Sequence, residues 1–70
     1  MATNKWGRRI KAFRKLKGYT QIDFAKKIGM SVSQLGDIER GHKVPSDETL
    51  AHIANHLGIS VEELAPKSEA

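Results

Sequence analysis

The sequence TQIDFAKKIGMSVSQLGDIERG, residues 20–41, decides the fold of this chain. Thr20 is a favourable helix N-cap, and Gly29 can adopt the left-handed conformation that ends a helix and starts a tight turn. Ser31, followed three residues later by Gln34, has the spacing of a capping box at the start of a second helix. The stretch therefore predicts two short helices joined by a tight turn.

The two predicted helices span residues 21–28 and 31–40, and they need to cross at a steep angle. Such a crossing requires a small residue at the point of closest approach, which Ala25 supplies. Leu35 and Ile38 are the inward residues of the second helix. This unit presents its second helix outward, where a DNA major groove about 12 Å wide accepts it.

Apolar residues on the N-terminal side predict a further amphipathic helix. Trp6, Ile10, Phe13 and Leu16 recur at spacings of three or four residues, so they are expected to form one buried stripe on a helix that ends before Gly18. The Lys and Arg residues of this segment then fall mainly on the other side.

Two more helices are predicted after Pro45, capped by Ser46 and by Ser60, which has Glu63 three residues later. Their inward residues are Leu50, Ile53, Ala54 and Leu57 in the first, and Val61 and Leu64 in the second. We therefore expect an all-α fold of five helices in one compact domain spanning residues 1–70, with an ordered core of about 5–65.

The charge distribution favours nucleic acid as a partner. The net charge is +4, yet residues 1–45 hold 11 Lys and Arg against 3 Asp and Glu, whereas residues 46–70 hold 1 against 5. A basic surface attracts polyanions and gains free energy by releasing counterions from phosphates. When only the charge is considered, a lysine-rich face that keeps the protein soluble is an equally good explanation.

Several classes of function are disfavoured by composition. The chain has no cysteine, which removes disulfides and cysteine-bound zinc, and no apolar run approaches the roughly 20 residues of a membrane span. His52 and His56 lie opposite the predicted buried stripe of their helix and lack an adjacent third ligand. We expect a cytoplasmic protein that is not an enzyme and takes no metal, cofactor or small-molecule ligand.

The ordered set of motifs resembles the lambda-repressor/Cro-type helix-turn-helix family, also called the XRE family, over nearly the whole chain. The residues that carry this resemblance are KLKGYTQ at 15–21, Ala25, Gly29, IERG at 38–41 and the Pro45-Ser46 pair. The resemblance implies a lambda-repressor-like DNA-binding domain and a sequence-specific regulator of transcription. It further implies a repressor that binds double-stranded DNA at a near-palindromic operator as a homodimer.

The resemblance also assigns roles to single residues. It implies DNA base contacts by Val32, Ser33 and Asp37, phosphate contacts by Thr20, Gln21, Arg40, His42 and Lys43, and a structural ion pair between Arg14 and Glu39.

Helical geometry can be applied to the same residues independently. With Leu35 at 0° and about 100° per residue, Ser33, Asp37 and Arg40 fall on the outward side at about 140–200°, and Glu39 faces inward. An inward carboxylate needs a partner, which supports pairing with Arg14.

The base-facing positions are sparse, because family members often carry Gln, Asn, Arg or Lys there and this chain has Val, Ser and Asp. The alternative function is that of an antitoxin or a partner-controlled regulator whose main role is protein–protein interaction. A short C-terminal segment, KSEA, disfavours the antitoxin, since such proteins usually keep a longer segment that wraps the toxin.

Overall fold

The computed structural model describes residues 5–66, and within this range every regular element is an α-helix. The helices are α1 (Lys5–Leu16), α2 (Gln21–Lys27), α3 (Val32–Glu39), α4 (Asp47–Leu57) and α5 (Val61–Leu64). The prediction of an all-α, five-helix fold is thereby confirmed.

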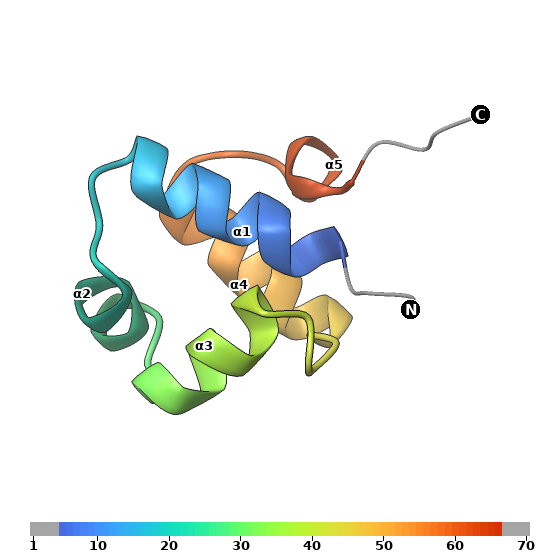
Figure 1. Ribbon diagram of the computed structural model, residues 1–70. Helices are drawn as coiled ribbons and strands as arrows, with labels where there is room; N and C mark the ends of the chain where they lie inside the picture. The colour runs from blue at the N-terminus through green and yellow to red at the C-terminus, as the bar shows by residue number, and fades with distance from the viewer. Residues whose placement is uncertain (1–4, 67–70) are drawn as a thin grey trace.

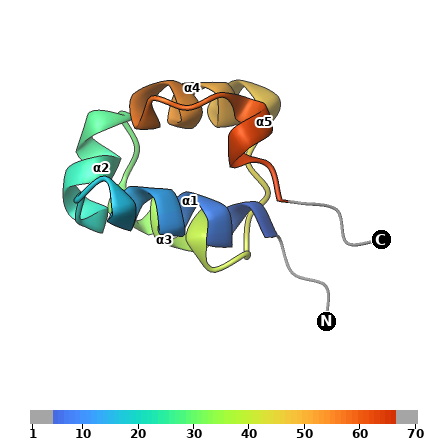
Figure 2. The ribbon, with the colours of Figure 1, turned by 90° about the horizontal axis from the view of Figure 1, so that it is seen from above.

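The helices enclose one core, with α1 and α3 on one side and α4 on the other (Figures 1 and 2). α2 closes one end of this arrangement, and α5 packs near the opposite end, where it contacts both α1 and α4. α3 lies along the edge of the molecule below α1 in the view of Figure 1. The chain therefore places the helix of the predicted DNA contacts at the surface.

Local capping sets most helix starts. The side-chain oxygens of Thr20, Ser31, Ser46 and Ser60 each accept a hydrogen bond from the backbone amide three residues later. At Ser31 the side chain of Gln34 also accepts from the Ser31 amide, which completes the predicted capping box. These bonds satisfy amides that a helix start would otherwise leave without a partner.

The buried core consists of Ile10, Phe24, Ala25, Ile28, Leu35, Ile38, Leu50, Ile53, Ala54, Leu57 and Leu64. Trp6 and Phe13 pack against it while partly exposed. Leu16, by contrast, is 75% exposed, so its place in the buried stripe was wrong. The buried residues of α1 are Gly7, Ile10 and Arg14, and Leu16 lies about 180° around the helix from Gly7.

Gly7 marks the place where α1 and α3 approach each other closely. A Cβ atom at this position would collide with the carbonyl oxygen of Ile38 and would lie 2.8 Å from that of Glu39. Any side chain at this position would therefore push α3 away from α1. Gly7 thus sets how α3 is seated on the rest of the molecule.

Candidate nucleic-acid interface

The helix-turn-helix consists of α2, a tight turn and α3. Ile28 is the C-cap of α2, and Gly29 has a φ of 70°, the left-handed conformation that the sequence predicts there. Ser31 then caps α3, which ends with Arg40 as its C-cap. The predicted bounds of both helices agree with the structure to within a residue at each end.

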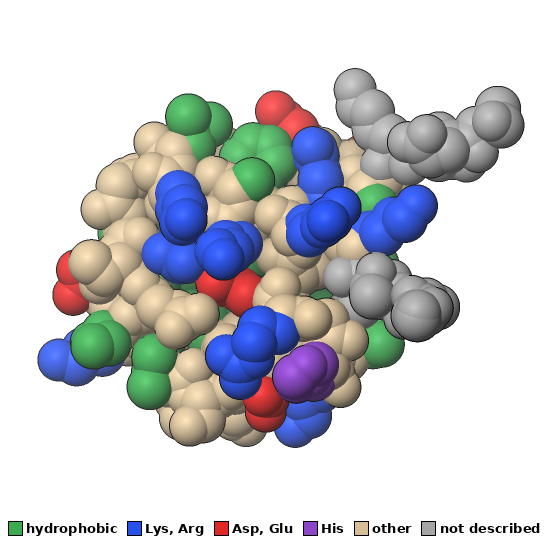
Figure 3. Space-filling model, viewed as in Figure 1, with side chains coloured by type: hydrophobic (Ala, Val, Ile, Leu, Met, Phe, Trp, Pro, Cys, Tyr) green, Lys and Arg blue, Asp and Glu red, His purple; other side chains and the backbone are tan. Residues whose placement is uncertain are grey.

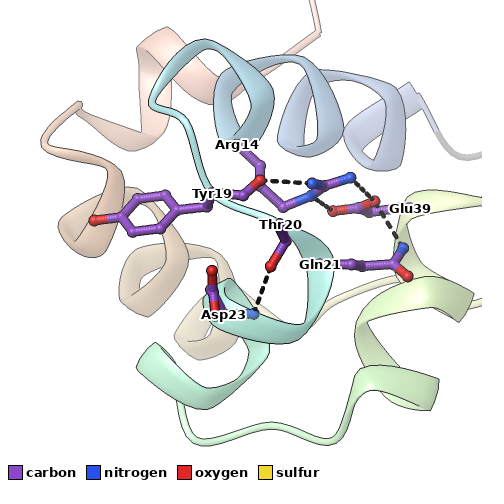
Figure 4. A network of polar contacts seen from close by, with 6 residues as sticks. All are labelled: Arg14, Tyr19, Thr20, Gln21, Asp23 and Glu39. Atoms are coloured by element: carbon purple, nitrogen blue, oxygen red, sulfur yellow. Dashed lines mark hydrogen bonds and ion pairs between the residues drawn. The ribbon is translucent and has the colours of Figure 1, made fainter.

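A buried ion pair fixes α3 against α1. Arg14 Nε lies 2.7 Å from Glu39 Oε2, and Arg14 Nη2 lies 3.1 Å from Glu39 Oε1, so the contact is bidentate (Figure 4). Arg14 Nη1 also donates to the carbonyl oxygen of Tyr19 at 2.8 Å. Each residue of the pair is only 6% exposed, and within residues 5–66 no fully buried side-chain N or O atom is without a hydrogen bond.

Gln21 extends this pair to α2. Its Nε2 donates to Glu39 Oε1 at 3.0 Å, so the Glu39 carboxylate joins residues from α1, α2 and α3 (Figure 4). The resemblance assigns Gln21 to a DNA phosphate, and in the free protein its half-buried amide is held by Glu39 instead. The two ends of the helix-turn-helix are therefore fixed relative to each other before any ligand arrives.

The outward side of α3 agrees with the geometry expected from the sequence. Leu35 and Ile38 are 0% and 4% exposed, whereas Val32 is 41% exposed and Ser33 is exposed. The side chain of Asp37 is 45% exposed. These residues form the outward side of α3, opposite the buried Leu35 and Ile38.

Asp37 is paired with Arg40 on this face, and His42 lies nearby. Its Oδ1 accepts from Arg40 Nη2 at 3.0 Å and lies 4.0 Å from His42 Nδ1. His42 and Lys43 are exposed in the loop that follows α3. The negative charge of Asp37 is thus paired with the positive charge of Arg40.

The surrounding surface is basic. The Lys and Arg side chains gather on the face formed by α1 and α3, with few acidic side chains among them (Figure 3). Lys5, Arg8, Lys11 and Lys15 of α1 are all exposed. The positive half of the chain is therefore presented on the same side as the outward residues of α3.

Two further contacts were not anticipated from the sequence, besides the bond between Gln21 and Glu39. Arg9 donates through Nη2 to the carbonyl oxygen of Glu63 at 2.7 Å and through Nε to that of Leu64 at 3.4 Å, so it ties α5 to α1. His52 Nε2 lies 3.0 Å from the carbonyl oxygen of Ile28 and links α4 to the end of α2. Basic side chains commonly bind the carbonyl oxygens that lack a partner at the end of a helix. Arg9 and Glu63 are 54 residues apart in the sequence, however, so no sequence spacing reveals that they meet.

Other kinds of site find no support in the part of the chain that the structure describes. Residues 5–66 contain no group of three or more His, Cys, Asp or Glu that could hold a metal ion. In the same range no helix is long and apolar enough to cross a membrane.

Comparison with known proteins gives consistent matches. The model of a family described as helix-turn-helix matches residues 10–64. The HTH-type transcriptional regulator YazB of Bacillus subtilis is 59% identical over 66 residues, which cover 94% of this chain and 96% of YazB. The immunity repressor of Bacillus phage phi105 is 49% identical over 55 residues, which cover 79% of this chain and 38% of the repressor.

A similar solved structure is that of SinR, the master regulator for biofilm formation, in complex with DNA. It superposes with a TM-score of 0.78 at 40% identity, over 84% of this chain and 95% of the SinR chain.

Proposed function

The chain belongs to the helix-turn-helix family of DNA-binding transcriptional regulators, of the lambda-repressor/Cro or XRE type, and on that premise we propose that it is a repressor with a near-palindromic operator. The observation that carries the proposal is the outward face of α3. This face is exposed, is flanked by basic residues and is held rigidly by the Arg14–Glu39 pair. It has the form that a recognition helix needs in order to enter the major groove.

We carry the roles of most helix-turn-helix residues over from the family resemblance. Val32 and Ser33 face the base edges, where Val32 can contact a thymine methyl group and Ser33 can donate or accept a hydrogen bond. Thr20, Gln21, His42 and Lys43 bind the phosphate backbone on either side of α3. Gln21 reaches phosphate in one of two ways. Its amide turns away from Glu39, or its second N–H donates to the phosphate while the first stays bonded to Glu39.

A homodimer is the second part of the proposal, because one domain of this size makes few DNA contacts and two copies on one duplex add their binding energies. The half-sites would lie about one helical turn apart. Leu64 of α5 is fully buried and has no free surface for a partner. Val44, 73% exposed in the loop after α3, is the residue that we expect at the dimer contact.

Selection from a pool of random duplexes at about 0.1 M salt tests the proposal directly. We expect enrichment of a symmetric motif, and we expect its affinity to fall steeply as the salt concentration rises, because bound counterions are released on binding. Sedimentation of the protein with the selected duplex should show two copies per duplex. We expect the protein to act without catalysis, in the cytoplasm.

Ser33→Ala is the informative variant, and Ser60→Ala, in the cap of the distant α5, is its matched control. Ser33→Ala should change the base preference at particular motif positions, whereas the control should leave every position unchanged. Enrichment of no motif would refute the operator proposal and would favour a regulator that acts through a protein partner.

A further inference from the structure

The side chain of Arg40 does not extend past the end of α3 toward the flanking phosphates. Its guanidinium turns back along the helix and is bound by Asp37, one turn earlier, with Nη2 3.0 Å from Oδ1. It remains 59% exposed in this position. The charged group therefore lies beside Gly36 and Asp37, within the last turn of α3.

Gly36 leaves the space that this conformation needs. A Cβ atom at Gly36 would lie 3.0 Å from Arg40 Nη1, 3.5 Å from Nη2 and 3.6 Å from Cζ, and these are the three atoms nearest to it. The glycine in the recognition helix thus has a specific consequence. It allows the guanidinium to lie close against the helix backbone while Asp37 holds it from the side.

We propose that Arg40, held by Asp37 over Gly36, reads a guanine in the major groove, and that Asp37 is a positioning residue. The proposal rests on the proposed function, and it gives these two residues roles that differ from the base contact by Asp37 and the phosphate contact by Arg40 that family resemblance implies. A guanidinium presents five N–H donors, and Asp37 accepts from one of its nitrogens. Guanine is the base whose major-groove edge carries two adjacent acceptors, N7 and O6, which match the arginine fork.

The pairing also solves the electrostatic problem of Asp37. An unpaired carboxylate in the groove would be repelled by phosphate and could accept only from the amino group of a cytosine or an adenine. With Arg40 bound to it, the negative charge of Asp37 is paired, and the remaining N–H groups of the guanidinium are donors for the bases. The orientation of the fork is fixed in advance, so less side-chain freedom is lost when the guanine is bound.

The test starts from the duplex that the random selection enriches. Each G·C pair of the motif is replaced in turn by A·T, and separately each guanine is replaced by 7-deazaguanine, which lacks the N7 acceptor. Affinities are measured for the wild-type chain, Arg40→Ala, Asp37→Ala and Gly36→Ala. Arg8→Ala and Glu62→Ala, exposed in α1 and α5, are the controls for the loss of a positive and of a negative charge.

We expect one guanine in each half-site whose replacement by adenine weakens wild-type binding on the order of tenfold or more. Arg40→Ala should abolish this preference and the effect of 7-deazaguanine at the same position. Asp37→Ala and Gly36→Ala should reduce the preference at that position alone, since they disturb the orientation of the guanidinium. Both controls should keep it, although they change the overall affinity.

Three results would overturn the inference. Equal weakening of all duplexes by Arg40→Ala, with the guanine preference intact, would show that Arg40 only binds phosphate. If Asp37→Ala kept the preference for guanine unchanged, Asp37 would not be a positioning residue. If the enriched motif contained no guanine, Arg40 would have no guanine to read. In each of these cases the motif is still enriched, so the proposed function stands, whereas the absence of any motif refutes both.

Discussion

Removal of the Glu39 carboxylate is the perturbation whose outcome the structure defines best. Arg14 is 6% exposed in the wild-type chain, and Glu39→Ala leaves its guanidinium with only the Tyr19 carbonyl oxygen as an acceptor among its present partners. It also removes the acceptor of the Gln21 amide. A buried ion pair that loses one partner typically costs about 3–5 kcal/mol, because the remaining charge stays desolvated.

This cost is large relative to the stability of the chain. A domain of 70 residues is expected to unfold with a free energy of about 4–10 kcal/mol. Urea-induced unfolding followed by circular dichroism should therefore show Glu39→Ala with a much lower midpoint, or largely unfolded without urea. The dependence on urea concentration should remain similar if the variant still folds to the same structure.

Asp37→Ala is the matched control for this measurement. It breaks the ion pair between Asp37 and Arg40 at the same helix. The side chains of this pair are 45% and 59% exposed, so solvent already screens their charges. Its cost should stay below about 1 kcal/mol. The double variant Arg14→Met with Glu39→Ala should recover much of the loss, because it removes the stranded charge. A cost for Glu39→Ala no greater than that for Asp37→Ala would refute the reasoning.

Three further predictions concern the fold. Gly7→Ala should lower the melting temperature by roughly 5–20 °C, since the added methyl group collides with α3 and overpacking costs about 1–3 kcal/mol, whereas helix propensity alone predicts a gain. Leu16→Gln should change the free energy of unfolding by less than about 0.5 kcal/mol, and Ile10→Ala should cost about 2–5 kcal/mol; similar values for both would contradict the observed burial. Ser31→Ala should destabilise the chain by about 1 kcal/mol through loss of the α3 cap, a change that urea unfolding would detect.

The sequence alone determined the helices and their ends. Four helices are capped through hydrogen bonds that span only three residues, from Thr20, Ser31, Ser46 and Ser60. The left-handed conformation of Gly29 is a property of that single residue. Such interactions depend on neighbours along the chain, so their residue types are readable from the sequence. The outward face of α3 was predictable for the same reason, because helical geometry fixes which residues lie opposite Leu35 and Ile38.

The tertiary structure decided which helix faces meet and which polar groups find partners. Leu16 fits the apolar period of α1 but is exposed, because the close approach of α3 at Gly7 and the pairing of Arg14 with Glu39 turn another side of α1 inward. The hydrogen bond from Gln21 to Glu39 likewise joins side chains that are 18 residues apart in the sequence. Contacts of this kind depend on how the helices cross, which is set by the packing of the whole core, and no local sequence pattern encodes them.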